Sequence, residues 1–312
     1  METIHKKMLE KSLSSLITTD YILLDLPYFT NVGDVLIWQS TLDLLAGINH
    51  RCLYSSSIET YRKRPLPKEC LIIFMGGGNW GDLWIRHHEF RRKILQDYPD
   101  NPILQLPQSV FFKEERYLRE DIGLFSKHKG GITICLRDEK SYNFCIQTYE
   151  NVKVLLLPDL VLAFNISKYA FAYKGKDVLF NKRCDSEAVS YDKFQIPHNA
   201  ETRDWPTMEK APSAIKTYNK FIPFLKRIDN KFNTNLYRNI TDNLYKRYFK
   251  NIIIRSGISF VNKYHTIYST RLHVAILAAL LNKKVYMIDN SYGKIKGVYN
   301  LWMKDLTNIE ML

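Results

Sequence analysis

Glycine, proline and cysteine are all scarce in this chain of 312 residues, which contains 13, 11 and 5 of them. So little glycine and proline excludes a collagen-like or low-complexity protein. The cysteines are odd in number and none forms a C-x-x-C pair, so we expect reduced, buried thiols rather than disulfides or a zinc site. No apolar run approaches the roughly 20 residues that cross a bilayer, and the charged N-terminus does not resemble a secretory signal. We therefore expect a cytoplasmic protein.

Acidic residues are fewer than basic ones, and the chain carries a formal net charge of +13. Residues 206–264 hold 12 Lys and Arg against 3 Asp and Glu, which places most of the excess there. Such an excess predicts an anionic partner: nucleic acid, an anionic membrane or a phosphorylated substrate. Hydrophobic residues make up 46% of the chain and aromatic residues 13%, which excludes a disordered protein.

Short apolar runs alternate with helical patterns along the first half of the chain. Five runs have the length and composition of buried strands: residues 21–26, 70–75, 102–106, 131–136 and 152–157. Strands that are apolar throughout, with helices between them, are typical of a parallel sheet covered on both faces. The sequence therefore predicts an α/β fold.

The second half repeats this pattern less regularly. We expect strands at residues 177–180, 266–268 and 284–288, a helix at 272–281, and a loop-rich region at 181–212. A basic, aromatic and largely helical stretch fills residues 213–263, with Pro223 as a break or kink. We place the domain boundary near residue 165, which gives an N-terminal domain of residues 1–164 and a C-terminal domain of residues 165–312.

Three consecutive glycines, Gly76, Gly77 and Gly78, follow the second strand and precede Asn79. Glycine lets backbone N–H groups approach an anion, and a helix N-terminus adds partial positive charge. The spacing matches neither Walker A nor G-x-G-x-x-G. A tight turn between a strand and a helix is the structural alternative, but three adjacent glycines favour contact with a ligand.

Two other polar turns follow predicted strands, where ligands bind in parallel α/β sheets. Asn31, Gly33 and Asp34 follow the first strand, and Gln108 and Ser109 follow the third. Asp34 and Ser109 could instead cap the helices that come next. Both turns are therefore candidates for substrate binding, and helix capping is the structural alternative for each.

An arginine ends the fourth strand, where Arg137 suits the bidentate binding of a carboxylate or phosphate. Asp138 either pairs with it or caps the next helix. Near the C-terminus, Arg271 and His273 open another β-α unit. A histidine in the first helical turn beside an anion could donate a proton.

A third basic residue, Lys294, follows the last apolar strand together with Ser291 and Tyr292. Arginine, histidine and lysine that converge on one crevice would form an anion pocket. By contrast, His87 and His88 lie on a charged helix without metal-ligand spacing to a carboxylate. No H-E-x-x-H, nucleophile elbow or paired-carboxylate signature is present, so we expect neither a metal nor a cofactor.

Taken in order, the motifs NVGD, GGGNWGD, LPQS, RD-x-x-S, TRLH and SYGK resemble those of the polysaccharide pyruvyl transferases. The resemblance runs from about residue 31 to residue 299, without a matching motif in residues 165–260. It implies two Rossmann-like domains facing a cleft, as in GT-B glycosyltransferases. It also implies transfer of pyruvate from phosphoenolpyruvate to two hydroxyls of a sugar in an exopolysaccharide or capsular polysaccharide precursor, with release of phosphate.

By motif match, the family's donor-binding arginine falls on Arg137, its essential histidine on His273 and its lysine on Lys294, with Lys296 as an alternative. Phosphoenolpyruvate is anionic at both ends, so Arg137, Arg271 and Lys294 could clamp its oxygens. His273 is our candidate for protonating the methylene carbon or the departing phosphate. Asp34 or Asp82 could deprotonate the sugar hydroxyl, although helix capping explains both.

The basic, aromatic stretch has two interpretations. It suits the headgroups of an anionic membrane, at whose inner face a lipid-diphosphate-linked sugar acceptor would lie; it also suits an amphipathic helix pair whose aromatic residues form a core. Two alternative functions remain: a GT-B-like glycosyltransferase with a nucleotide-sugar donor, and a basic nucleic-acid-binding protein. The second lacks the common nucleic-acid-binding signatures, so we expect no specific nucleic acid partner.

Overall fold

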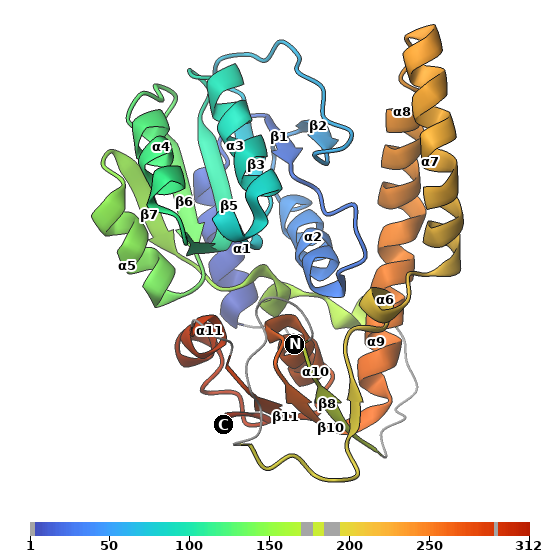
Figure 1. Ribbon diagram of the computed structural model, residues 1–312. Helices are drawn as coiled ribbons and strands as arrows, with labels where there is room; N and C mark the ends of the chain where they lie inside the picture. The colour runs from blue at the N-terminus through green and yellow to red at the C-terminus, as the bar shows by residue number, and fades with distance from the viewer. Residues whose placement is uncertain (1–3, 170–176, 184–193, 290–292) are drawn as a thin grey trace. The chain divides into compact units, whose positions relative to one another are not determined.

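The computed structural model in Figure 1 describes residues 4–169, 177–183, 194–289 and 293–312. The chain divides into two compact units, each of which is assembled from three separate segments. The first unit comprises Met1–Leu26, Ile37–Asn165 and Lys296–Asp305. The second comprises Pro27–Leu36, Ile166–Ile295 and Leu306–Leu312.

The first unit contains a parallel sheet in the order β2-β1-β3-β5-β6-β7, to which β4 adds by pairing with β5. Its strands are β1 (Tyr21–Leu24), β2 (Cys52–Ser56), β3 (Leu71–Phe74), β4 (Gly77–Gly81), β5 (Ile103–Phe111), β6 (Ile132–Leu136) and β7 (Val152–Leu156). All four residues of β1 and of β3 are buried. Continuous apolar runs form these central strands because both faces of a parallel sheet are covered.

Helices pack on this sheet through apolar faces. The helices are α1 (Ile4–Leu16), α2 (Val32–Leu45), α3 (Ile85–Asp97), α4 (Glu115–Phe125) and α5 (Glu139–Thr148), with short 3₁₀ turns η1 (Asp82–Trp84) and η2 (Leu160–Ala163). A core cluster joins α3, α4 and α5 to one face of the sheet (Figure 1), with Ile94, Phe125 and Cys145 contributed by the three helices. The helix α2 begins in the second unit and ends in the first.

The second unit contains a smaller parallel sheet in the order β12-β11-β10-β8-β9. Its strands are β8 (Asp177–Asn181), β9 (Glu201–Arg203), β10 (Tyr264–Ser269), β11 (Lys284–Met287) and β12 (Ile309–Met311). Its helices are α6 (Pro206–Glu209), α7 (Ser213–Phe232), α8 (Leu236–Leu244), a π-helical segment η4 (Tyr245–Phe249), α9 (Lys250–Asn262) and α10 (Leu272–Leu280), after the short turn η3 (Ile166–Lys168). The helix α11 (Lys294–Trp302) starts here and continues into the first unit.

The predicted α/β fold with parallel sheets is confirmed, and each predicted strand is present within a few residues. Two local predictions differ from the structure. The glycine turn after β3 continues as the short strand β4, and α7 runs through Pro223 without the break that was one of the two expectations there. The region 181–212 is loop-rich as expected, and its described part contains only the short elements β9 and α6 after the end of β8. The described helices include none that is both long and apolar enough to span a membrane.

Three cysteines, Cys70, Cys135 and Cys145, are buried free thiols, as expected, whereas Cys52 is exposed and Cys184 lies outside the described residues. Burial raises the pKa of Cys135 to about 12. A buried thiol with so high a pKa forms almost no thiolate at neutral pH, so it behaves as an apolar core group.

Candidate functional site

Polar residues gather where the parallel strands of the first unit end. Asp25 follows β1, Asn79 and Gln108 lie on β4 and β5, Arg137 follows β6, and Asp159 follows β7. Because these strands run in the same direction, their carboxyl ends form one edge of the sheet. Ligands of parallel α/β sheets bind at this edge.

Arg137 forms a buried ion pair with Asp159, with Nη1 2.5 Å from Oδ2 and both side chains 1% exposed. Its Nε donates to Ser109 Oγ at 2.9 Å. Ser109 lies inside β5, so the prediction that it caps a helix is wrong. The removal of one partner from a buried pair costs about 3–5 kcal/mol, since the remaining charge stays uncompensated. The pair therefore stabilises the ends of β5, β6 and β7.

The next residue, Asp138, caps α5 by accepting a hydrogen bond from the backbone N–H of Ser141 at 2.8 Å. The Ser141 hydroxyl in turn accepts from the backbone N–H of Val110 at 2.9 Å. Of the two roles considered for Asp138, capping is confirmed. The R-D-x-x-S spacing is thus explained locally, because its Asp and Ser attach the start of α5 to β5.

A second polar network joins β1, β4 and β5 to α3. The guanidinium of Arg91 donates from Nη2 to Asp25 Oδ2 at 2.8 Å and to Asn79 Oδ1 at 2.6 Å. Gln108 Nε2 donates to the same Asn79 oxygen at 2.6 Å, and His87 Nδ1 lies 2.7 Å from Asp25 Oδ1. Asn79 and Gln108 were expected at the site, but Asp25, His87 and Arg91 were missed. The sequence did contain one indication of the last two: His87 and Arg91 have the i, i+4 spacing that places them on one face of a helix, and this helix follows the glycine motif.

The first glycine of the triplet, Gly76, lies where β3 approaches β5 closely. A Cβ atom at this position would lie 2.5 Å from the carbonyl oxygen of Pro107 and 3.3 Å from the Leu160 side chain. Backbone packing is therefore a sufficient reason for glycine there. Gly77 has a φ of 140°, which disfavours other residues, and Gly78 is partly exposed.

In the second unit, the NVGD motif begins α2. Asn31 Oδ1 accepts from the backbone N–H of Gly33 at 3.0 Å, and its Nδ2 donates to Asp34 Oδ2 at 2.7 Å. The cap of α2 is therefore Asn31, and the prediction that Asp34 provides it is wrong. Asp34 instead lies in the first turn and orients the amide that makes the cap.

His273 lies directly against this motif. It is the second residue of α10, is half-buried, and a Cβ atom added to Gly33 would lie 2.3 Å from its Nδ1. Only glycine leaves room for the imidazole at that distance. Two motifs some 240 residues apart in the chain thus meet within one unit, where the first turns of α2 and α10 adjoin.

Arg271 is paired through both arms of its guanidinium. Its Nε lies 2.5 Å from Asp204 Oδ1, and its Nη2 donates to Oδ2 at 2.7 Å. This arginine is 6% exposed, so Asp204 is an ion-pair partner that sequence reasoning missed. The two-armed geometry fixes the loop before α10.

The last predicted motif is described only in part. Ser291, Tyr292 and the side chain of Lys294 lie outside the described residues. Lys294 begins α11, and the backbone N–H of Ile295 donates to Asp289 Oδ1 at 3.1 Å. Asp289 therefore caps the helix that carries Lys294.

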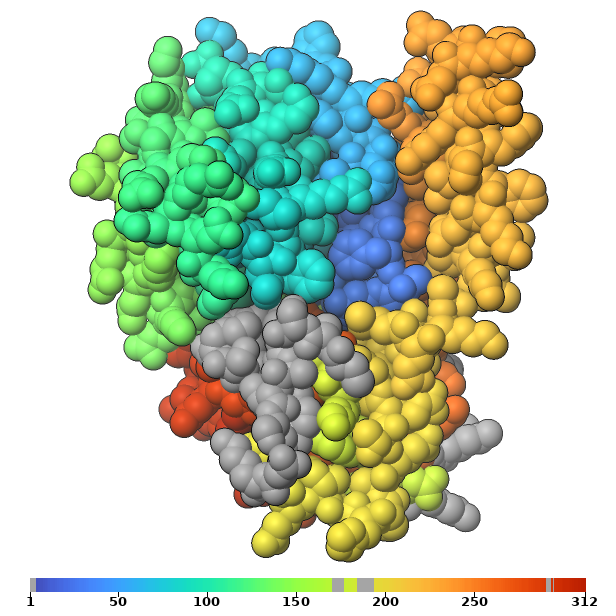
Figure 2. Space-filling view, viewed as in Figure 1, coloured from blue at the N-terminus to red at the C-terminus, as the bar shows by residue number. Residues whose placement is uncertain are grey.

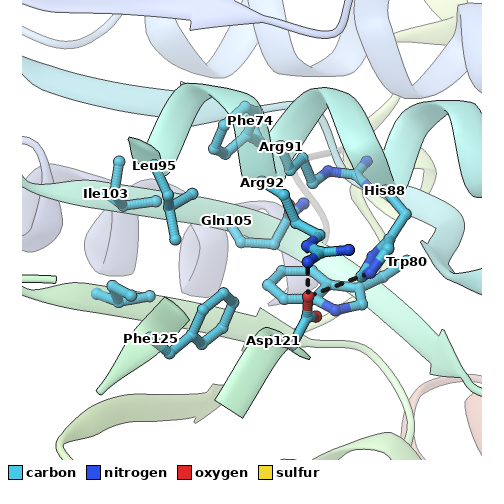
Figure 3. Close-up of a pocket in the computed structure, with 11 residues that line it drawn as sticks. Phe74, Trp80, His88, Arg91, Arg92, Leu95, Ile103, Gln105, Asp121 and Phe125 are labelled. Carbon is cyan, nitrogen blue, oxygen red and sulfur yellow. Dashed lines mark ion pairs between the residues drawn. The ribbon is translucent and has the colours of Figure 1, made fainter. Parts of the chain in front are cut away.

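The histidine next to His87 has a structural role instead. His88 Nε2 lies 3.1 Å from Asp121 Oδ1, and Arg92 Nε lies 3.6 Å from the same oxygen. Figure 3 shows both side chains pointing at Asp121 across a small cavity lined by Phe74, Trp80 and Phe125. His88 and Asp121 are 2% and 1% exposed, so this pair is internal. Among the described residues, no group of three metal-ligating side chains is present.

Comparison with known proteins identifies the family. The family model for polysaccharide pyruvyl transferases matches residues 31–292. The chain is 28% identical to EpsO of Bacillus subtilis over 94% of this chain and 88% of that protein. It is 27% identical to Pyruvyl transferase 1 of Schizosaccharomyces pombe over 91% and 70%. A crystal structure of a functionally uncharacterised Klebsiella pneumoniae protein matches with a TM-score of 0.65 at 20% identity, over 99% of both chains, and so shares the fold. With a family match over most of its length, the chain belongs to the polysaccharide pyruvyl transferases.

Proposed function

We propose that the protein transfers pyruvate from phosphoenolpyruvate to two hydroxyls of one sugar in an exopolysaccharide or capsular polysaccharide precursor. The product is a pyruvate ketal, and inorganic phosphate is released. The observation that carries the proposal is the position of His273 against Gly33 in a chain of this family. An imidazole at the junction of two helix N-termini can bind an anion and supply a proton.

The chemistry requires a proton donor at the donor substrate. Protonation of the methylene carbon turns the carbon that bears the phosphate oxygen into an oxocarbenium-like electrophile, which the first sugar hydroxyl attacks. Phosphate then leaves with the electrons of its C–O bond, and the second hydroxyl closes the ketal. The two sugar hydroxyls lose one proton each. This equals the proton that the methylene carbon gains plus the proton that leaves with phosphate. We assign the protonation of the methylene to His273.

Anion binding in this proposal involves Arg137, Arg271 and Lys294. Arg137 and Arg271 each pair with a carboxylate, Asp159 and Asp204. A guanidinium has five N–H donors, so one carboxylate partner is compatible with a second anion. The proposal includes a GT-B-like arrangement in which both units supply residues to one cleft. It also includes Gly78, Asn79 and Asn31 as contacts to substrate.

The acceptor is proposed to be lipid-linked, and the exposed face of α7 supports this. Three phenylalanines of α7 are largely exposed: Phe221, Phe224 and Phe232, at 56%, 62% and 62%. Their spacing places all three on one side of the helix, within about a quarter of its circumference. The inner face of α7 packs on α8, where Tyr218 and Thr241 share a hydrogen bond. The surface of α7 and of its turn into α8 is orange in Figure 2.

Basic side chains border this aromatic stripe. Lys220, Arg227 and Lys231 lie on the adjacent side of α7 by helical spacing. An apolar stripe bordered by cations suits an anionic lipid surface, where a helix lies in the plane of the headgroups. Other aromatic residues of this stretch, Tyr237 and Phe249, are buried. The buried rings fit the helix-pair interpretation, and we propose the membrane contact for the exposed ones only.

The test is a reaction of the purified protein with phosphoenolpyruvate and candidate glycans. We expect phosphate release only with a suitable acceptor, and a pyruvate adduct by mass spectrometry. His273→Ala should lower kcat by about 10²–10⁴-fold through loss of the proton donor, with an unchanged circular dichroism spectrum. His265→Ala, at an exposed position on β10, is the matched control and should leave turnover unchanged. Near-normal turnover in His273→Ala would contradict the assignment.

A further inference from the structure

A buried carboxylate and a partly exposed imidazole form a dyad at the carboxyl edge of the first sheet. The Asp25 side chain is 0% exposed, whereas that of His87 is 19% exposed. Asp25 Oδ1 lies 2.7 Å from His87 Nδ1. When Nδ1 donates its proton to this oxygen, the lone pair of the ring is on Nε2. The geometry is that of a carboxylate that orients a histidine for proton transfer.

The surroundings of Asp25 fix the dyad. The chain turns sharply after β1, because Asp25 has a φ of 67°, a conformation that aspartate tolerates better than most residues. Its second oxygen accepts from Arg91 at 2.8 Å, and Arg91 is held in turn by the side chain and carbonyl oxygens of Asn79. The carboxylate charge is therefore balanced by Arg91.

We propose that His87 is the general base that removes the proton from the attacking sugar hydroxyl, and that Asp25 positions its ring. This inference rests on the proposed function and supplies the base which that mechanism requires. In the step, the hydroxyl proton moves to Nε2 while the oxygen forms its bond to the electrophilic carbon. The proton then leaves for solvent or for the departing phosphate.

The carboxylates that the sequence suggested for this task have other partners. Asp34 accepts a hydrogen bond from Asn31 at the cap of α2. Asp82 accepts from the backbone N–H groups of Lys113 at 2.9 Å and of Glu114 at 2.6 Å. Asp34 therefore orients the amide that caps α2, and Asp82 holds the backbone just before α4. His87 differs because a buried carboxylate orients its ring and its side chain is 19% exposed.

The test measures kcat and the KM for phosphoenolpyruvate in the full-length protein with a glycan acceptor. His87→Ala should lower kcat by about 10²–10⁴-fold with little change in that KM, and added imidazole should restore part of the rate. His87→Gln retains an N–H donor toward Asp25 and should be as inactive as His87→Ala. Asp25→Asn should lower kcat without rescue by imidazole, because the ring is present but wrongly held. His50→Gln, on the loop before β2, is the control and should be unaffected.

The outcomes separate the inference from the function on which it rests. A purely structural role for His87 predicts that His87→Gln keeps normal turnover and that imidazole rescues no variant, and either result overturns the base assignment. Thermal melting of each variant shows whether a loss of turnover is due to a loss of folding. If a variant is unfolded, only a rate restored by imidazole would support the assignment of His87 as the base. A wild-type protein that forms no ketal contradicts the proposed function, and the base assignment with it.

Discussion

At the scale of single residues, the first unit holds its polar side chains at the sheet edge by fixed partners. Arg137 is paired with Asp159, and Arg91 bridges Asp25 to Asn79. Buried charges remain stable only when they are paired and hydrogen-bonded. Under the proposed function this pairing matters, because side chains with locked rotamers are preorganised and need little rearrangement when a substrate binds.

The contact between Gly33 and His273 makes a residue-scale prediction. Gly33→Ala places a methyl group 2.3 Å from His273 Nδ1, so the imidazole must move. A displacement of about 1 Å of a catalytic group can cost about 10²-fold in rate, and we expect a fall in kcat of that order. The control is Gly123→Ala in α4, where an added Cβ meets nothing within 4 Å.

Steady-state phosphate release, with melting temperatures for both variants, checks this prediction. Gly123→Ala should be neutral or slightly stabilising, because alanine favours helix over glycine. Equal turnover in Gly33→Ala and the wild type would show that His273 needs no fixed position against α2.

At the scale of elements, continuous apolar runs predicted the central strands because burial on both faces leaves a strong signal. The strands β4 and β9 gave no such signal. β4 consists of glycines with Asn79 and Trp80, and β9 is Glu201–Arg203 at the edge of its sheet. Their strand conformation comes from pairing with β5 and β8, a tertiary effect that local composition does not carry.

The α7 helix carries the element-scale prediction. The double variant Phe221→Ser with Phe224→Ser removes two exposed aromatic rings. Each ring that becomes buried in the lipid surface contributes about 1.5–3 kcal/mol to binding. The affinity of the double variant for anionic phospholipid vesicles should therefore be at least about tenfold weaker than that of the wild type. Co-sedimentation with anionic and with zwitterionic vesicles measures this. Ile146→Ser on α5, at a position 51% exposed, is the control.

Salt and alternative ligands complete that experiment. Binding to anionic vesicles should weaken at high ionic strength, because exposed charges are screened. Unchanged vesicle binding in the double variant would contradict the membrane contact. Binding of the wild type to an oligonucleotide but not to vesicles, lost in the same variant, would reassign the surface to nucleic acid.

At the scale of the whole molecule, the two units do not follow the order of the chain. The NVGD motif precedes most of the first unit in sequence, yet it belongs to the second unit, because α2 passes from one to the other. Local patterns identified Gly33 and His273 separately as site candidates. Their contact depends on this interleaving. The pairs of Asp25 with Arg91 and of Asp204 with Arg271 each form within one unit, between residues more than 60 positions apart in the chain. The sequence alone could therefore list candidate side chains but not most of the pairs they form.

Two half-buried histidines and the positive net charge together predict how the stability of the protein depends on pH. Burial lowers the pKa of His5 and of His128 below the usual value of 6.5. Below pH 6.5 the unfolded chain therefore binds protons that the folded chain does not, so the free energy of unfolding should fall as the pH decreases from 7.5 to 5.5. Acidification also increases a formal net charge that is already +13 and so adds repulsion.

Urea unfolding at both pH values, with and without added salt, separates these two contributions. Salt should recover the part that arises from repulsion, since it screens exposed charges, but not the part that arises from burial. His128→Gln keeps a donor for the Asn101 carbonyl oxygen, which lies 2.8 Å from Nε2, and removes one titrating group. This variant should therefore lose less stability on acidification than the wild type, and an equal loss would show that His128 is protonated in the folded protein.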